Sequence, residues 1–555
     1  MLKKLSIVAI CFAFLCGNAI AQDAKTVIAD AQKALGDLKS ISYSGTAKDV
    51  AFQQCGANAT DMTCRGTHDP MRPISNYVRV IDLTAPTSRQ TGGTNNIGAG
   101  GSTAVTAGTF FQQVTPQQAD VSQPWANSVD FYLTPWGFLK GAAENNAMTS
   151  KRKVDGKNYT VLTWSPKVTA PSGKNYTING YVNEQNIVDR VETWLPDNIM
   201  GDMHVLAVYT GWRDFGGVKA PAKIVQTRGG WPFFEADITN AKPNPPDLAT
   251  IAAAPAPANR GGGGGGAPGG APAGGAGGGG GGARGGQAGA VPPVPGAAAA
   301  GAGAAAGGAR GGQAPAAGGP PPGGGGGGGA QAAMTVTNEK LGEGIYRLTT
   351  GNGSYDSVVI GFKDYVMMLE AGQSQARGLA YIAETKKLFP GKPIRYVMNT
   401  HPHSDHTGGL PALVAEGATI ITQQNNKEFL EKALNTPRTL LAADDSLAKS
   451  GKKAKVEAVG EKKVYSDGTR TVEFYHIFPA PHSNGLMVAY IPKEKIMFQG
   501  DFSLPNPGQP ANDHIKALVA ALEKLKLTDF DRYINVHTST APQSKAELWK
   551  AVKGD

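Results

Sequence analysis

Residues 394–409 read IRYVMNTHPHSDHTGG, and the interpretation of the whole chain starts from this stretch. Its first seven residues hold Ile394, Tyr396, Val397 and Met398, a short β-prone run that predicts a buried strand. The next six place three imidazoles and one carboxylate on the turn that leaves the strand, and two glycines then lead toward a helix. Imidazole with carboxylate is a ligand set that zinc prefers. The stretch therefore predicts a metal site where a strand ends and a helix begins.

The spacing within this cluster suggests two metals. On an extended segment the alternate residues His401 and His403 point the same way and can bind one ion, whereas Asp405 and His406 follow the turn and can reach a second ion. A polar loop that is rich in histidine by chance is the competing interpretation. Possible partners farther along the chain disfavour it, because each follows an apolar run: His482, Asp501 and His537.

With these residues, the region from about 334 to 555 resembles the metallo-β-lactamase-fold hydrolase superfamily. The resemblance implies a four-layer αβ/βα domain and a dinuclear site with two Zn²⁺ per chain. It implies His401, His403 and His482 on one metal, Asp405, His406 and His537 on the other, and Asp501 as a bridge between them. Glu370 stands where the family usually has an aspartate, at a position that supports the site.

The first residues are typical of an exported protein. A basic start, an apolar run from Leu5 to Cys16 and the small residues around Ala21 predict a cleaved signal peptide over residues 1–21. We therefore expect a periplasmic or secreted protein, with lipid attachment at Cys16 disfavoured. In an oxidising compartment Cys55 and Cys64 are expected to form a structural disulfide, with a redox or metal pair as the alternative.

Residues 22–251 predict a mostly antiparallel β domain. A helix is expected near residues 24–36, followed by many short strand candidates separated by turns, which suggests a curved sheet that partly wraps a helix. In element order alone this part resembles the half-barrels of periplasmic lipoprotein carriers, so an envelope lipid or protein is one expected ligand. His68 and His204 are isolated and are interpreted as structural or surface residues.

Residues 252–333 are almost wholly Gly, Ala and Pro. Such a segment has no large apolar side chains to offset its ordering entropy, so it predicts a disordered linker that acts as a passive tether. A Gly-rich coil of about eighty residues would hold its ends roughly 50 Å apart on average. The chain as a whole is therefore expected to be α+β, with the linker between the N-terminal β domain and the C-terminal domain of residues 334–555.

The net charge of +9 does not by itself indicate nucleic acid as a partner. Lys and Arg are spread over both halves, and the densest run, residues 449–463, is interrupted by two glutamates, as in a solvated surface. We expect a small-molecule substrate and no nucleic-acid partner.

These features predict an exported zinc-dependent hydrolase that uses a metal-bound hydroxide to cleave an ester, lactone, thioester or amide bond, β-lactams included. Asp405 is the expected catalytic residue, since it can both hold metal and orient the hydroxide. Two alternatives stay open: a mononuclear iron oxygenase resembling persulfide dioxygenases, and an envelope ligand-binding protein with a non-catalytic metal domain. Five residues flank the ligand loops and either touch substrate or support the loops: His476, Asn484, Ser503, Asn506 and His514.

Overall fold

The computed structural model describes residues 23–49, 71–91, 109–113, 124–253, 334–350, 355–480, 482–505, 510–537 and 542–554. The predicted signal peptide, the Cys55–Cys64 disulfide, His68, Asn506 and nearly all of the predicted linker lie outside these residues. In the part of the chain that is described, no helix combines the length and the apolarity needed to cross a membrane.

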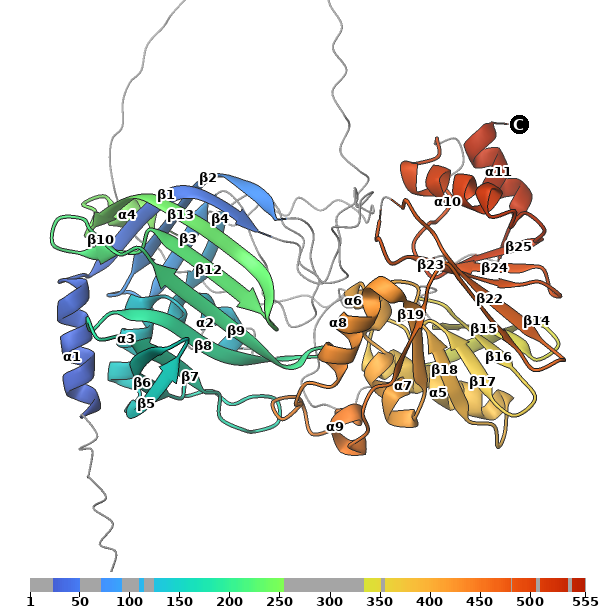
Figure 1. Ribbon diagram of the computed structural model, residues 1–555, viewed down its shortest axis with the longest axis horizontal. Helices are drawn as coiled ribbons and strands as arrows, with labels where there is room; N and C mark the ends of the chain where they lie inside the picture. Colours follow the sequence, from blue (N-terminus) through green and yellow to red (C-terminus); the bar gives the residue numbers. More distant parts are fainter. Residues whose placement is uncertain are drawn as a thin grey trace, which may run out of the picture. The chain divides into compact units, whose positions relative to one another are not determined.

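The N-terminal part is built on one antiparallel sheet of eleven strands, in the order β4-β3-β2-β1-β13-β12-β9-β8-β7-β6-β5 (Figure 1). Its strands are β1 (Ser40–Asp49), β2 (Arg72–Asp82), β3 (Thr87–Thr91), β4 (Thr109–Gln113), β5 (Met148–Val154), β6 (Lys157–Trp164), β7 (Ile178–Val182), β8 (Val188–Asp197), β9 (Gly201–Thr210), β12 (Lys223–Arg228) and β13 (Trp231–Pro243). A short pair, β10 (Arg213–Asp214) and β11 (Lys219–Ala220), lies apart from this sheet. The prediction of a mostly antiparallel β region is confirmed.

Four helices accompany the sheet: α1 (Ala24–Leu35), α2 (Pro124–Tyr132), α3 (Pro135–Glu144) and α4 (Leu248–Ile251). The predicted first helix is confirmed, and it ends at Gly36, whose φ of 98° disfavours other residues. Helix α3 packs closely on the sheet because Gly141 has no side chain, and a Cβ there would lie 2.2 Å from the Trp164 ring. The strand and helix faces thus share one apolar core.

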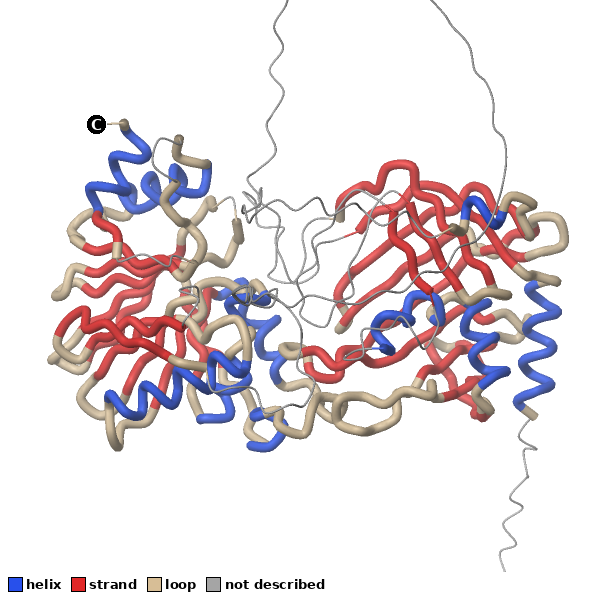
Figure 2. Tube along the Cα trace, turned by 180° about the vertical axis from the view of Figure 1, so that it is seen from behind, coloured by secondary structure: helices blue, strands red, loops and turns tan. Residues whose placement is uncertain are grey.

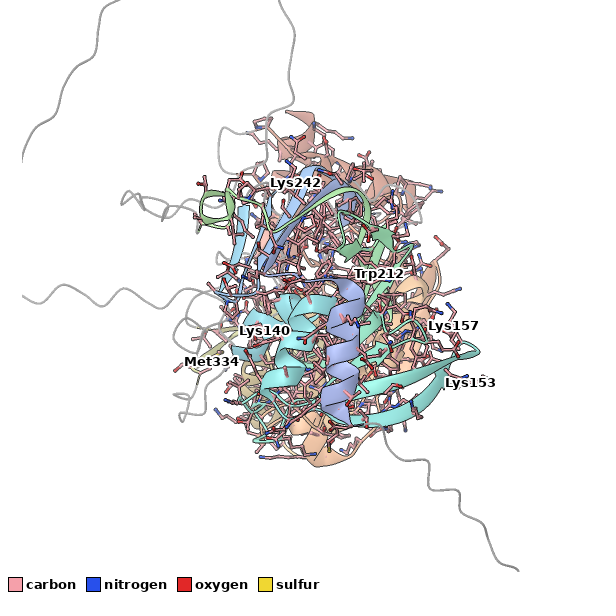
Figure 3. The ribbon with its side chains drawn as sticks, turned by 90° about the vertical axis from the view of Figure 1, so that its left-hand side faces the viewer. Lys140, Lys153, Lys157, Trp212, Lys242 and Met334 are labelled. Atoms are coloured by element: carbon pink, nitrogen blue, oxygen red, sulfur yellow. The ribbon has the colours of Figure 1, made fainter. Side chains whose placement is uncertain are left out.

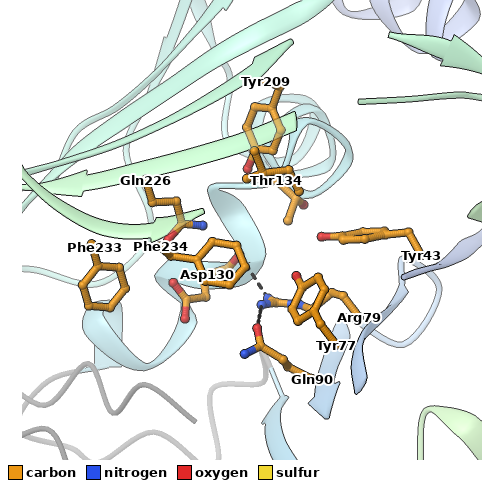
Figure 4. A pocket seen from close by; sticks show the side chains of 11 residues that line it. Tyr43, Tyr77, Arg79, Gln90, Asp130, Thr134, Tyr209, Gln226, Phe233 and Phe234 are labelled. Carbon is orange, nitrogen blue, oxygen red and sulfur yellow. Dashed lines mark hydrogen bonds between the residues drawn. The ribbon is translucent and has the colours of Figure 1, made fainter. Parts of the chain in front are cut away.

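A small polar cavity lies within this N-terminal part, lined by Tyr43, Tyr77, Arg79, Gln90, Asp130, Thr134, Tyr209, Ile224, Gln226, Phe233 and Phe234 (Figure 4). The buried Arg79 guanidinium donates hydrogen bonds to the Gln90 side chain and to the Asp130 backbone carbonyl. The cavity volume is about 20 Å³, which holds about one water molecule and is too small for a lipid chain.

Strand β5 is an edge strand of the eleven-stranded sheet, and its side chains are largely exposed. Lys153 and Lys157 flank the β5–β6 turn and point away from the sheet (Figure 3). Lysines along an end strand oppose pairing with other chains, because stacking another strand there would desolvate their charges. We therefore interpret these lysines as residues that protect the edge of the sheet from pairing with another chain.

The C-terminal part has two sheets, seven-stranded and six-stranded. The first contains β14 (Val336–Gly342), β15 (Ile345–Thr350), β16 (Ser357–Gly361), β17 (Val366–Leu369), β18 (Ile394–Met398), β19 (Thr419–Gln423) and β20 (Val456–Val459). The second contains β21 (Lys462–Ser466), β22 (Thr471–His476), β23 (Met487–Ile491), β24 (Ile496–Gln499), β25 (Arg532–Asn535) and β26 (Gln543–Ser544). Strands β17 to β20 are parallel to one another, and so are β24 and β25.

Helices lie on the outer sides of these two sheets (Figure 2). They are α5 (Gln375–Leu388), α7 (Leu410–Glu416), α8 (Gln424–Leu434), α9 (Ser446–Ser450), α10 (Asp513–Lys524) and α11 (Lys545–Lys553), and the short α6 (Ser404–Thr407) lies in the loop between β18 and α7. One core cluster joins the inner faces, with Ile360 and Met398 from the first sheet and Phe474 and Phe498 from the second. A separate cluster packs α10 and α11 on the second sheet. The predicted four-layer arrangement is confirmed.

The expectation that the linker holds the two parts well apart is wrong for the described residues, while its role as a passive tether stays a prediction. Those before residue 254 and after residue 333 form one compact unit. The Asp202 carboxylate accepts hydrogen bonds from the backbone N–H groups of Thr439 and Leu440, at 2.9 and 2.8 Å. Such contacts can outweigh the entropic cost of closing the long linker, because that cost grows only with the logarithm of the loop length. The predicted domain boundaries themselves stay predictions.

Candidate metal centre

The predicted ligands lie on loops that leave the ends of strands in both C-terminal sheets. The strands and the residues that follow them are β18 with His401, β22 with His482, β24 with Asp501 and β25 with His537. Each strand is mostly buried. Packing therefore fixes the position of the strand end from which the ligand loop starts. A rigid scaffold thus brings together side chains that are as many as 136 positions apart in the sequence.

Three imidazoles form the first cluster. The Nε2 atom of His401 lies 2.9 Å from Nδ1 of His403 and 3.0 Å from Nε2 of His482. His401 and His403 are buried, and the three donor atoms lie with the Asp501 carboxylate in one group that can hold a metal ion. The predicted first ligand set is brought together by the fold.

Asp405, His406 and His537 form the second cluster. The Nε2 atoms of His406 and His537 are 3.1 Å apart. One Asp405 oxygen lies 3.6 Å from the first of these atoms and 3.5 Å from the second. The short helix α6 carries both Asp405 and His406, and the ring centroid of His406 lies 4.2 Å from that of His401, so the two clusters adjoin.

The Asp501 carboxylate reaches both clusters with different oxygens. Its Oδ1 atom lies 2.7 Å from Nε2 of His406 and 2.7 Å from Nε2 of His537. Its Oδ2 atom lies 3.2 Å from Nε2 of His401 and also contacts His482. One carboxylate between two imidazole clusters is the geometry required of a bridging ligand.

Outer contacts orient the imidazoles toward the centre. Glu370 is fully buried, and one of its oxygens accepts the backbone N–H of Thr400 at 2.6 Å while the other lies 3.3 Å from Nδ1 of His406. The hydroxyl of Thr400 lies 3.0 Å from Nδ1 of His401. With Nδ1 engaged outside, the Nε2 atoms of His401 and His406 face the centre. Glu370 thus occupies the supporting place that the resemblance implied for it.

Burial and neighbouring charges favour neutral imidazoles at His401 and His403 and an ionised carboxylate at Asp501, the forms that bind metal. Burial, and next the neighbouring His406, lower the pKa of His401 to about 3. Burial, followed by His401 and His482, holds the pKa of His403 well below its ordinary value. Burial opposes ionisation of Asp501, but the imidazoles of His406, His482 and His401 outweigh it and hold the pKa of that carboxyl well below its usual range.

His406 behaves differently. Burial disfavours its charged form, but the carboxylates of Asp501, Asp405 and Glu370 outweigh burial and raise the pKa of His406 well above its ordinary value. Without metal this imidazole therefore holds a proton, which a cation at the second cluster has to displace. We expect metal affinity at this cluster to fall as the pH falls.

The donor atoms fit zinc. Several imidazole nitrogens approach one another within about 3 Å, and ionised Asp501 adds negative charge there. Nitrogen ligands gathered this closely, beside a carboxylate, form the donor set that zinc takes. The residues could hold two ions, one in each cluster.

Comparison with known proteins agrees with this geometry. Residues 350–550 match the family model of the metallo-beta-lactamase superfamily. The C-terminal domain belongs to this superfamily. The match lies wholly within the C-terminal part, so the resemblance of the N-terminal part to lipoprotein carriers stays a prediction.

Solved structures similar to this chain include metallo-β-lactamases and an alkylsulfatase. A metallo-beta-lactamase from Pontibacter korlensis has 17% identity and a TM-score of 0.29, over 39% of this chain and 95% of that one. The metallo-beta-lactamase FIM-1 from Pseudomonas aeruginosa, in its mono-zinc form, has 16% identity and a TM-score of 0.29, over 40% and 96%. The sec-alkylsulfatase Pisa1 from Pseudomonas sp. has 15% identity and a TM-score of 0.28, over 39% and 41%.

In this metallo-β-lactamase-fold domain, three of the residues predicted to flank the ligand loops support those loops: His476, Asn484 and Ser503. His476 is buried, with Nε2 2.9 Å from the Asn484 carbonyl oxygen and Nδ1 3.3 Å from Glu461. The hydroxyl of Ser503 donates to the Asn535 side chain at 2.9 Å. These contacts brace the loops that carry His482, Asp501 and His537. In the N-terminal part His204 lies 2.9 Å from Glu192, a structural contact as predicted.

Two aromatic rings, those of His514 and Tyr355, pack against the candidate ligands, and only His514 was a candidate from the sequence. The flanking residue His514 packs its ring 5.3 Å from His482 and 5.1 Å from Phe502. Tyr355 was not predicted, and its ring centroid lies 4.8 Å from that of His537. Its φ of 60° is uncommon for an aromatic residue and appears only in the structure. A tyrosine after a Gly-Asn-Gly-Ser run reads as a loop residue, so no sequence signal marked it.

Proposed function

We propose that this chain is an exported zinc-dependent hydrolase that cleaves an ester, lactone, thioester or amide bond, β-lactams included. The observation that supports this most strongly is the Asp501 carboxylate, one oxygen of which lies 2.7 Å from the second cluster and the other 3.2 Å from the first. This arrangement favours a dinuclear centre over a single ion. The first metal would be held by His401, His403 and His482, and the second by Asp405, His406 and His537.

Zinc bound by these residues would lower the pKa of a coordinated water and polarise the electrophile. The protein supplies the rest. Glu370 and Thr400 fix the rotation of the imidazoles, and the partly exposed Asp405 carboxylate can accept a hydrogen bond from a water at the centre and orient it. The ring of Tyr355 packs against His537 and the ring of His514 against His482, so both rings adjoin the ligands.

Metal analysis together with a substrate panel tests the proposal. Protein purified without added metal should contain about two zinc ions per chain and should hydrolyse at least one lactone, thioester or β-lactam, with loss of turnover in chelator. Asp405→Ala and His482→Ala should abolish that turnover, whereas Asp529→Ala, a change to an exposed carboxylate, should keep it. Iron with no hydrolysis would favour the oxygenase alternative, and full activity in either ligand variant would exclude the assigned centre.

A further inference from the structure

The turn between β8 and β9, residues 197–202, belongs to the N-terminal part but contacts the segment that carries the second metal cluster. The Nδ2 atom of Asn198 donates a 2.8 Å hydrogen bond to the backbone carbonyl of Gly408. Gly408 is two residues beyond His406 and forms the C-cap of α6, the helix that carries Asp405 and His406. Residues 210 positions apart thus meet directly behind two predicted ligands.

The turn is rigid before it makes this contact. The Asp197 side chain accepts the backbone N–H groups of Ile199 and Met200 at 2.9 and 2.8 Å, which closes a local turn. Ile199 and Met200 are both 3% exposed. Asn198 is therefore presented on a fixed backbone, and little entropy is lost when its amide binds Gly408.

A second group of contacts locks the turn onto the loop of residues 436–445. The Arg438 guanidinium donates to the Asn198 carbonyl at 2.7 Å and also forms a buried, two-bond ion pair with Asp445. The backbone N–H of Asp202 donates to the Pro437 carbonyl at 2.6 Å. Gly201 lies so close that a Cβ there would be 2.4 Å from the same carbonyl oxygen. The docking thus requires a glycine at 201.

The receiving segment has little freedom of its own. A Cβ on Gly408 would lie 1.9 Å from the Gln373 carbonyl oxygen, and a Cβ on Gly409 would lie 1.9 Å from that of Ala371. The backbone N–H of Gly409 donates to the Gly372 carbonyl at 2.8 Å. The α6 end is therefore held between residues 371–373, which follow Glu370, and Asn198.

We propose that Asn198 is a positioning residue for the second metal cluster, and that the N-terminal part tunes this cluster through it. The amide fixes the end of α6, and α6 fixes the direction of Asp405 and His406. This inference rests on the proposed dinuclear function. It assigns the N-terminal part a role in the metal chemistry of the C-terminal domain.

Two measurements on the full chain test the inference. Competition with a chromophoric chelator should show that Asn198→Ala weakens binding of the second zinc about tenfold, as for other groups that orient ligands, and leaves the first unchanged. Asn198→Asp removes the donor at constant size and sets an oxygen against the Gly408 carbonyl, so its effect should be at least as large. The matched control is Asn158→Ala, at an exposed position of β6.

Hydrogen exchange on the metal-free protein provides a second readout, which does not depend on the proposed function. In Asn198→Ala the amides of residues 404–409 should exchange faster than in wild type and in the control variant. Faster exchange confined to residues 197–202 and 436–440, with unchanged metal affinity, would overturn the inference. Wild-type protein that binds fewer than two metals would instead contradict the proposed function, whatever the exchange data show.

Discussion

At the scale of single residues, Asp501 has the largest predicted effect on the metal centre, because both of its oxygens are engaged. Asp501→Asn keeps the shape but replaces one charged oxygen with an amide that cannot bridge. We expect the zinc content to fall from about two per chain to one or fewer and turnover to fall at least 100-fold. Elemental analysis and initial rates measure both. Unchanged zinc content would show that this carboxylate does not bridge.

Glu370 gives a finer test, because it accepts hydrogen bonds with both oxygens. In Glu370→Gln one acceptor becomes a donor. If the amide oxygen keeps the Thr400 N–H, the amide nitrogen faces Nδ1 of His406 and favours the tautomer with its proton on Nε2, where metal should bind. We expect second-site zinc affinity to fall 10- to 100-fold with little change at the first site. Equal weakening at both sites would indicate a general loss of structure.

The sequence was sufficient to predict the side chains that the fold brings together as candidate ligands, but not the residues around them. Each ligand follows a buried strand or lies in the HxHxDH cluster, and strand ends can be recognised from apolar runs. Tyr355 and Asn198 lie in turns, and nothing in a turn indicates which distant segment it will contact. Their roles depend on tertiary packing, which single-sequence patterns do not encode.

At the scale of elements, β8 contains a buried carboxylate whose protonation should affect stability. Burial by itself raises the pKa of Glu192, but hydrogen bonds from His204, Tyr181 and Asn179 outweigh it and lower the pKa to about 2. A depressed folded-state pKa stabilises the protein above the unfolded value of about 4.5, and the gain is lost as the pH falls from there toward 2. Allowing for solvent screening, we expect this contribution to be about 1–2 kcal/mol.

Urea unfolding from pH 2 to pH 7 measures this contribution. In Glu192→Gln the free energy of unfolding should be lower at pH 7 and should decline less steeply between pH 4.5 and 2. Glu184→Gln, at an exposed position in the β7–β8 turn, is the control and should follow the wild type. If the free energy of unfolding declined equally steeply below pH 4.5 in Glu192→Gln and in wild type, other carboxylates would dominate the acid dependence of stability.

Strand and helix positions also differ in how well the sequence predicted them. The first helix was predicted within one residue because its apolar spacing ends at Gly36, which cannot be replaced easily at that φ. The antiparallel strands of the N-terminal part were predicted as a set, but their order in the sheet was not. Strand β1 pairs with β13, which lies almost 200 residues away, and this pairing is decided by packing and not by local propensity.

At the scale of the whole molecule, we expect the hydrogen bonds around Asp202 and Arg438 to make the two parts unfold together. These hydrogen bonds cross between the parts, and each contributes about 1 kcal/mol that is lost when its groups are separated. Gly201→Ala should separate them without altering any charged group, because its new methyl would overlap the Pro437 carbonyl. Calorimetry should therefore show one unfolding transition for the wild type and two for Gly201→Ala.

The control for this experiment is Gly216→Ala, since Gly216 also has a positive φ but a Cβ there would meet no atom within 4 Å. This variant carries the same backbone strain without the overlap, so it should retain a single transition. Two transitions in wild type would mean that the interface is too weak to couple the parts, and the linker alone would then set their association. A single transition in Gly201→Ala would mean that contacts elsewhere, such as the Trp231 ring against Phe429, are sufficient for coupling.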